Sequence, residues 1–234
     1  MSGRKTRVHR GDCPCIVANP YGGTCPKPPE SAGYSIERGM PKRILIVDGH
    51  PDPMAERYVH ALSRAYCDGA RGAGHEIRSI IVSEIEFPLL RTSAEFEAGQ
   101  PPDSIRECQD SLLWADHVVI LFPLWLGSMP ALLKGFFEQA LRPGFAFAAP
   151  EGQGLPRRLL RGKTARIIVT MGMPALFYRW YFRSHSLKSL QRNILRFCGF
   201  NPVKASIVGM VKEMGTERRG RWLQRVQELG AKGL

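Results

Sequence analysis

From residue 43 onward, mostly apolar runs, of which 43–48 is the most continuous, alternate regularly with amphipathic stretches. The apolar runs are short and rich in β-branched residues, as strands buried on both faces are. They lie at 43–48, 77–82, 117–122, 165–171 and 205–211. Between them, apolar residues recur every three or four positions, which predicts helices. These lie at 53–72, 105–115, 131–141, 187–197 and 222–229.

This alternation predicts an α/β domain over residues 42–234. Right-handed βαβ crossovers place helices on both faces of a parallel sheet, so we expect a doubly wound, five-stranded parallel sheet. Asp52 and Pro53 are expected to start the first helix, because Asp caps helix N-termini and proline fits the first turn. No repeat or further shift in composition within this range indicates a second domain.

Residues 1–41 differ from the rest, since their many prolines and glycines leave no helical or strand period. We predict a disordered or loosely attached tail here, and a true translation start at Met40 is an alternative explanation. The tail holds residues that resemble a zinc set, although their spacing favours solvated thiols: His9, Cys13, Cys15 and Cys25. The other three cysteines fall on apolar helix positions and are expected to be buried thiols: Cys67, Cys108 and Cys198.

The formal net charge of +12 raises the question of a nucleic-acid partner. Residues 42–156 hold ten Lys and Arg against fifteen acids, whereas residues 157–234 hold seventeen against three. Such asymmetry equally suits an anionic ligand, a membrane surface or an acidic partner. Since no nucleic-acid-binding motif accompanies it, we expect no nucleic-acid partner and a local field that attracts phosphate groups.

The sequence shows no sign of a membrane-spanning segment or a secretory signal. No uncharged apolar run reaches the roughly 18 residues of a membrane span, and the first thirty residues lack the apolar core of a secretory signal. We therefore expect a cytoplasmic protein that does not span the membrane.

In a doubly wound sheet, ligands bind beyond the carboxyl ends of the strands. The first loop at that edge, 48–57, leads into a helix start, where free backbone N–H groups favour a phosphate. It lacks both the dinucleotide-binding glycine motif and the P-loop. His50 and Arg57 offer hydrogen bonds or charge to an anion, although His50 alone is equally compatible with a structural role.

Two further loops belong to the same predicted edge. Loop 122–130 presents large apolar side chains between prolines, which suits a flat heteroaromatic ligand, a cap on the core or a second subunit. Loop 170–185 brings together a hydroxyl, a glycine, several aromatics, two arginines and a histidine. Interleaved arginines and aromatics are also compatible with stacking on single-stranded bases.

Five segments carry a family resemblance: 115–125, 129–138, 144–147, 170–172 and 197–200. In them the chain resembles the flavodoxin-like NAD(P)H:quinone oxidoreductases, which include modulator-of-drug-activity reductases and ancillary proteins of potassium-efflux systems. The match runs from residue 42 to about residue 230. It implies the strand order 2-1-3-4-5, an FMN or FAD at the carboxyl edge of the sheet, and NAD(P)H as co-substrate.

The resemblance also implies roles for particular residues. His50 would lie at the phosphate and ribitol end of the flavin, and Arg57 would compensate for the hydroxyl and amide side chains that other members place there. Tyr178 and His185 would match the tyrosine and histidine that stabilise charge on the reduced flavin and supply a proton. The isoalloxazine ring would be lined by residues from two strand ends: Pro123, Leu124, Trp125, Leu126, Gly127, Thr170 and Gly172.

The chain departs from the family pattern at three places. Ala55 and Arg57 stand where the family usually has Ser and Asn, and residues 173–176 replace a glycine-rich stretch, which should reshape the acceptor site. The spacing from Tyr178 to His185 differs by one residue, which leaves a surface or helix-capping role open for His185.

The activity that the resemblance implies is ping-pong, two-electron reduction of quinones or similar acceptors by NAD(P)H. A homodimer is expected because the family's active site lies at the subunit interface. The alternative is a flavin-binding ancillary or regulatory subunit of a membrane transporter. No metal site is expected.

Overall fold

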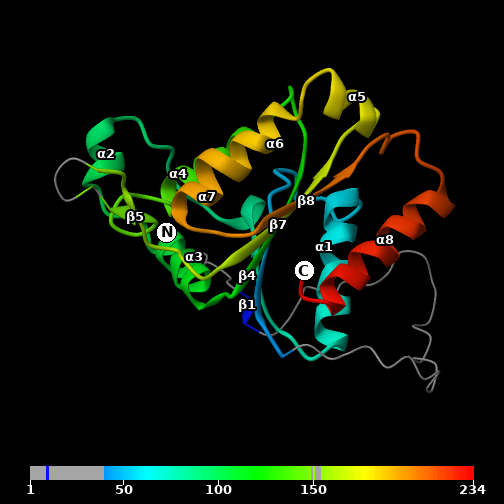
Figure 1. The fold of residues 1–234 in the computed structure, drawn as a ribbon, viewed down its shortest axis with the longest axis horizontal. Helices are drawn as coiled ribbons and strands as arrows, with labels where there is room; N and C mark the ends of the chain where they lie inside the picture. The colour runs from blue at the N-terminus through cyan, green and yellow to red at the C-terminus, as the bar shows by residue number, and fades with distance from the viewer. Residues whose placement is uncertain (1–8, 11–39, 149, 151–153) are drawn as a thin grey trace, which may run out of the picture.

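A parallel sheet forms the centre of the computed structural model, which describes residues 9–10, 40–148, 150 and 154–234 (Figure 1). Its five parallel strands are β2 Arg43–Asp48, β3 Glu76–Ile81, β4 His117–Pro123, β7 Thr164–Thr170 and β8 Val203–Val208. Their order is β3-β2-β4-β7-β8, with every neighbouring pair parallel. The predicted order 2-1-3-4-5 is thereby confirmed.

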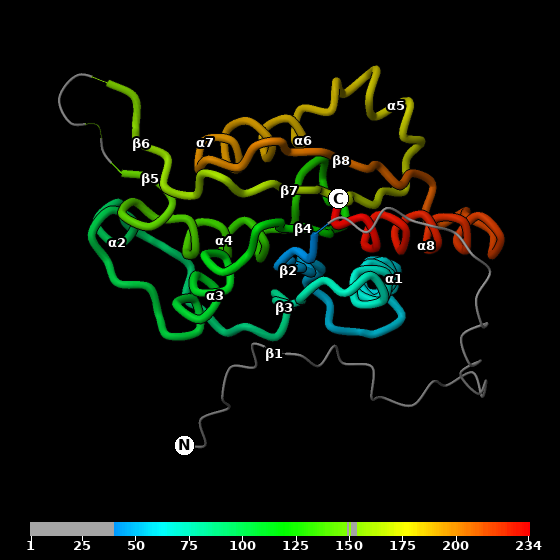
Figure 2. Tube along the Cα trace, turned by 60° about the horizontal axis from the view of Figure 1, so that its bottom comes forward, coloured from blue at the N-terminus to red at the C-terminus, as the bar shows by residue number. Residues whose placement is uncertain are grey.

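Helices cover both faces of the sheet, as Figures 1 and 2 show. One face carries α1 (Tyr58–Gly72) and α8 (Thr216–Ala231), whose apolar sides enclose one hydrophobic core. A larger core lies beneath the other face. Its helices are α3 Asp103–Trp114, α4 Ala131–Ala140, α6 His185–Ser189, the π-helix η2 Leu190–Leu195 and α7 Arg196–Cys198.

The two helices of the first face cross with their backbones in contact. A Cβ on Gly69 would lie 1.9 Å from the carbonyl oxygen of Gln227, and one on Gly230 would lie 2.1 Å from that of Tyr66. No larger residue fits either position without moving a helix, so these two glycines set how closely α1 and α8 approach.

Several short elements were not predicted. They are the edge strand β1 (His9–Arg10), η1 (Val82–Glu84), α2 (Ser93–Glu97), the hairpin of β5 (Phe147–Ala148) with β6 (Arg157–Arg158), and α5 (Ala175–Trp180). β1 pairs antiparallel with β3. Each is too short to establish a hydrophobic period, so the sequence pattern gives no signal for it.

Several predicted boundaries were wrong, and the last helix begins at Thr216, six residues before the predicted range. The first long helix begins at Tyr58, because the Asp52 carboxylate accepts hydrogen bonds from the Met54 N–H (3.0 Å) and the Arg57 Nε (2.7 Å) and so stabilises a loop. The last strand ends at Val208 rather than at 211, since Met210 has a φ of +60°, which an extended strand excludes.

The cysteine prediction is confirmed for the three helix positions: Cys67, Cys108 and Cys198 are buried and form no disulfide. Burial raises the pKa of Cys108 and of Cys198 to about 12. Cys13, Cys15 and Cys25 lie outside the described residues, as does nearly all of the predicted tail, so both interpretations there stay predictions. Within the described ranges, no helix combines the length and the apolar character that crossing a membrane requires.

Candidate functional site

The carboxyl ends of β2, β4 and β7 bring the three predicted loops to one edge of the sheet. The backbone N–H of Gly49 donates to the carbonyl of Leu121 (2.7 Å), which joins the end of β2 to β4. The N–H of Leu124 donates to the carbonyl of Thr170 (2.7 Å), which joins the end of β4 to β7. Segments far apart in sequence therefore form one continuous surface.

The first part of this surface is the β2–α1 loop, residues 49–57, in which His50 is the predicted ligand-binding residue. The side chain of His50 is buried, and its Nδ1 accepts the backbone N–H of Asp52 (3.0 Å). Burial lowers the pKa of His50, and the neighbouring His60 adds to this. A neutral ring with an accepting Nδ1 carries its proton on Nε2. No described residue accepts that N–H, so it is available to an anion.

The start of α1 offers further N–H groups on the same surface. Together with the Nε2–H of His50, these groups form what we call the anion cradle. Arg57, at the position before the helix, makes no side-chain cap, and the first turn contains no acidic residue. The first backbone N–H groups of the helix thus remain open to an anionic ligand. Arg57 itself forms an ion pair with Asp52 and holds the loop. The pKa of Asp52 is lowered, chiefly by the hydrogen bond from Met54 and also by Arg57.

Trp125 connects the cradle to the second loop. Its ring meets the His50 ring edge to face, with centroids 6.0 Å apart. Trp125 and Ser128 close a tight turn through N–H to carbonyl bonds of 2.8 and 2.9 Å. The two residues between them, Leu126 (φ +47°) and Gly127 (φ +76°), both adopt left-handed backbone. This turn fully exposes Leu126 and leaves about half of Trp125 exposed.

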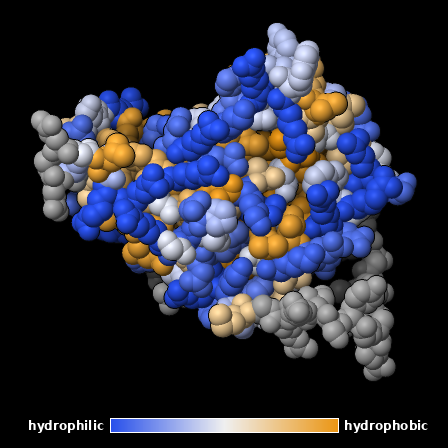
Figure 3. Space-filling model, viewed as in Figure 1, coloured by the Kyte–Doolittle hydropathy of each residue, from blue (hydrophilic) through white to orange (hydrophobic). Residues whose placement is uncertain are grey.

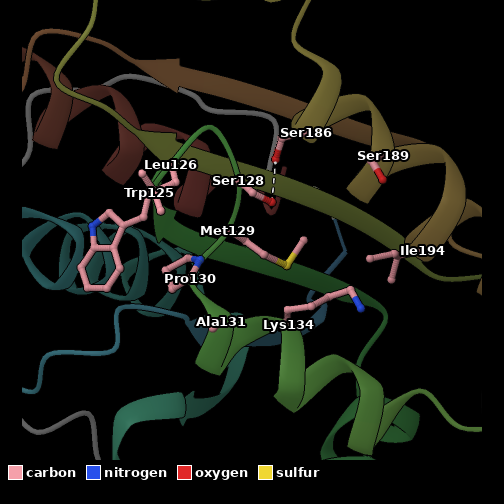
Figure 4. A pocket seen from close by; sticks show the side chains of 10 residues that line it. All are labelled: Trp125, Leu126, Ser128, Met129, Pro130, Ala131, Lys134, Ser186, Ser189 and Ile194. Carbon is pink, nitrogen blue, oxygen red and sulfur yellow. Dashed lines mark hydrogen bonds between the residues drawn. The ribbon is translucent and has the colours of Figure 1, made fainter.

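A cavity of about 460 Å³ opens between this turn, α4 and α6 (Figure 4). Trp125 and Leu126 lie on the turn, while Met129 and Lys134 extend toward Ile194 (Figure 4). Its lining is mostly apolar, with the Lys134 ammonium and several serine hydroxyls as its polar groups. Lys134 also forms an ion pair with Glu138, one turn further along α4. Such a cavity suits a flat apolar molecule that carries a few polar substituents.

The predicted residues of the third loop lie at different depths. Thr170 is buried at the end of β7, and Gly172 is exposed, with open space where a side chain would lie. The Tyr178 side chain is only 1% exposed; its hydroxyl accepts the backbone N–H of Leu187 (3.3 Å), and burial raises its pKa. His185 begins α6 and is exposed. Among the described contacts, no hydrogen bond joins Tyr178 to His185, and the roles of both residues stay predictions.

An exposed aromatic cluster projects beside the cavity, around α5. Figure 3 shows hydrophobic and hydrophilic side chains interleaved over this face. Phe177 and Tyr181 stack with their centroids 5.1 Å apart. The exposed apolar side chains of the cluster are Leu176, Phe177, Trp180, Tyr181 and Phe182.

Three site residues were not predicted: Asp48, His60 and Arg219. Asp48 and His60 are buried beneath the β2–α1 loop and contact each other at 2.7 Å. The Arg219 guanidinium lies 5.0 Å from the Tyr58 ring, so one basic residue of the last third does reach the start of α1. In the described part of the chain, no group of three or more His, Cys, Asp or Glu could hold a metal ion.

Comparison with known proteins places this geometry in a family. The model of the Flavodoxin_2 family, described as a flavodoxin-like fold, matches residues 42–229. The ribosyldihydronicotinamide dehydrogenase [quinone] of Pongo abelii is 37% identical over 216 residues, covering 80% of this chain and 92% of that protein.

Solved structures agree on the fold. The NAD(P)H:quinone oxidoreductase from Methanothermobacter marburgensis superposes with a TM-score of 0.70 at 21% identity, covering 82% of this chain and 96% of that one. An FMN-dependent NADH-azoreductase from Bacillus anthracis, in complex with FMN, gives 0.64 at 18% identity, covering 82% and 98%. The chain belongs to the flavodoxin-like NAD(P)H:quinone oxidoreductase family.

Proposed function

We propose that this protein is a flavin-dependent NAD(P)H oxidoreductase that reduces quinones or similar acceptors by two electrons. The observation that carries the proposal is the contact between an anion cradle and an exposed aromatic surface, made where the His50 and Trp125 rings meet. A flavin has this same polarity, with a phosphate at one end and a flat ring at the other. The quinone dehydrogenase that is 37% identical supports the same activity.

The residues at the carboxyl edge fit such a cofactor. The unaccepted Nε2–H of His50 and the open start of α1 suit its phosphate. The exposed Trp125 and Leu126 offer apolar surface to the ring, and the open space at Gly172 leaves room beside it. When bound, the flavin supplies hydride chemistry, accepting two electrons from NAD(P)H and passing them to the acceptor.

The chain's own groups orient the reactants and handle protons. The backbone N–H groups of Leu126 and Gly127 would bind the polar edge of the ring, since those of Trp125 and Ser128 already bond to each other across the turn. The phenol of Tyr178, whose raised pKa keeps it protonated, and the imidazole of His185 would stabilise negative charge there and supply the proton. Arg57 would act indirectly, by holding the β2–α1 loop through Asp52.

Three finer features belong to this proposal. The cofactor is FMN or FAD; a solved relative of the same fold contains FMN. The active form is a homodimer, which would cover Leu126, Leu176 and Trp180 beside the cavity. The protein works in the cytoplasm, where NAD(P)H is present.

The proposal is tested by loading the purified protein with FMN and, separately, with FAD. After removal of free cofactor, we expect retained flavin absorbance, a single cofactor mass on release, and quinone-dependent NAD(P)H oxidation. Absence of retained flavin with both cofactors would refute the proposal. Retained flavin without quinone-dependent oxidation would favour the transporter-subunit alternative.

A further inference from the structure

A buried network of titratable groups lies beneath the β2–α1 loop. Asp48 ends β2, His60 lies in the first turn of α1, and His50 and Asp52 belong to the loop. The side chains of Asp48, His50 and His60 are each less than a tenth exposed. The proposed function uses His50 and Asp52 of this network and assigns no role to Asp48 or His60.

Both ring nitrogens of His60 face hydrogen-bond acceptors. Nδ1 lies 2.7 Å from Oδ2 of Asp48, and Nε2 lies 2.9 Å from the backbone carbonyl oxygen of Asp52. A carbonyl only accepts, so Nε2 must carry a hydrogen; an ionised carboxylate also only accepts, so Nδ1 must carry one too. The Asp48–His60 pair therefore holds one proton more than a carboxylate beside a neutral histidine would.

His75 provides the contrast within the same chain. It is also buried, and it follows the end of α1 remote from the loop. Its Nδ1 accepts the backbone N–H of Lys42 (3.1 Å), and its Nε2 lies 3.3 Å from the carbonyl of Ala231. One acceptor and one donor suit a neutral ring. The additional proton is therefore a property of the surroundings of His60 and not of buried histidines in this fold.

The same pair fixes the β2–α1 loop from two sides. Oδ1 of Asp48 accepts the backbone N–H of His50 (3.2 Å), while His60 holds the carbonyl of Asp52. The N–H of Asp52 donates in turn to the His50 ring, whose centroid lies 5.3 Å from that of His60. The result is a fixed His50 ring with Nδ1 occupied and Nε2–H left for a ligand.

We propose that Asp48 and His60 form a proton-holding pair that positions the β2–α1 loop for the phosphate of the cofactor, and that loss of this proton loosens the loop. His60 is thus a positioning residue that acts through His50 and the backbone of Asp52. The proposal rests on the proposed flavin-dependent function, and it adds a dependence of phosphate binding on pH.

The direction of that dependence follows from the groups facing His60. These are Asp48 from β2, His50 and Asp52 from the loop, and Arg64 from the next turn of α1. Burial disfavours the charged ring, but Asp48 and the Asp52 carbonyl outweigh it and raise the pKa of His60, with Arg64 opposing them. The stabilisation is therefore complete below the ordinary histidine pKa of about 6.5 and is lost as pH rises through the raised value.

The pair itself is tested in the cofactor-free protein by imidazole nitrogen NMR across a pH titration. We expect both nitrogens of His60 to carry hydrogen below about pH 6.5, and we expect His60 to lose its proton at higher pH than His50 does. A His60 ring that carries a single proton throughout would overturn the proposal. Because no cofactor is present, this result does not depend on the flavin-dependent function.

The effect on the loop is tested by comparing FMN with riboflavin, which lacks the phosphate. By flavin fluorescence, we expect His60→Asn and Asp48→Asn to weaken FMN binding about tenfold near pH 6.5 and to leave riboflavin binding unchanged. The advantage of the wild type over His60→Asn should shrink toward about pH 9. His75→Asn, the matched loss of a buried histidine, should bind FMN as the wild type does.

Equal weakening of FMN and riboflavin by both variants would overturn the proposal, since it would indicate a general structural role. An advantage of the wild type that stays constant with pH would overturn the pH dependence. If the wild type binds neither flavin, the proposed function fails, and the NMR titration alone decides whether the pair exists. Circular dichroism of each variant verifies its fold, and Asp48→Asn replaces His60→Asn if the latter unfolds.

Discussion

At the scale of single residues, Tyr178 is a buried side chain that is also proposed to supply a proton in the reaction. Its ring is buried, and its hydroxyl accepts the N–H of Leu187 at the start of α6, where Ser186 and Ser189 line the cavity. The tyrosine therefore supports the helix that forms one wall of the cavity.

For Tyr178→Phe we expect kcat to fall by about 10- to 100-fold with the flavin still bound, because a proton donor is lost while the ring is kept. Steady-state kinetics of the flavin-loaded variant measures this. Tyr66→Phe is the control: Tyr66 is equally buried, but its hydroxyl donates to the carbonyl of Leu234 on the α1 and α8 side. Unchanged kcat in Tyr178→Phe would remove Tyr178 from the reaction.

The sequence predicted the location of residues that directly follow a strand, because the end of a strand fixes where they lie. His50 and Trp125 were both expected at the carboxyl edge, and the structure brings them into contact. Asp48 and His60 were missed because their pairing depends on how α1 is rotated against β2. From sequence alone, a histidine on the buried face of a helix is indistinguishable from a core residue.

At the scale of elements, the close crossing of α1 and α8 makes the clearest energetic prediction. We expect Gly69→Ala to destabilise the protein by about 3 kcal/mol, because the new Cβ would lie 1.9 Å from the Gln227 carbonyl oxygen. Gly72→Ala, in the same helix but with nothing within 4 Å, should be neutral or stabilising by up to about 1 kcal/mol. Urea unfolding of both variants compares them, and equal stabilities would contradict the close contact.

The length of an element decides whether a sequence pattern can predict it. The five central strands were found because each is a mostly apolar run of six or seven residues between helices. Short elements such as α2 and α5 were missed, since five or six residues hardly complete one hydrophobic period. The start of α1 was misplaced because the Asp52 carboxylate serves a loop, and capping and loop-forming aspartates have the same sequence signature.

At the scale of the whole molecule, the charge of +12 arises from an acidic first part and a strongly basic last third. Arg219, one of the basic residues of the last third, lies over the Tyr58 ring at the start of α1. The exposed apolar side chains of the α5 cluster lie at the same edge of the sheet. Both features are accounted for if this edge binds an anionic cofactor and meets a second subunit.

If two subunits meet at this edge, mutation of the exposed apolar side chains of the α5 cluster should change the oligomeric state. Replacing Leu176 and Trp180 with Glu should shift the flavin-loaded protein from dimer toward monomer in sedimentation experiments, because charge is introduced into the exposed apolar surface that the proposed dimer would cover. Replacing Leu155 with Glu, which is also exposed but lies outside the cluster, is the control and should leave the dimer intact. A dimer that persists in the double variant would place the subunit contact elsewhere.

The central claim is that one bound flavin passes two electrons from NAD(P)H to a quinone. Anaerobic spectrophotometry of the flavin-loaded protein tests it most directly. One equivalent of NAD(P)H should bleach the flavin absorbance, and one equivalent of quinone should then restore it, before any turnover. A flavin that NAD(P)H does not bleach, or that stays bleached after the quinone is added, would contradict the account.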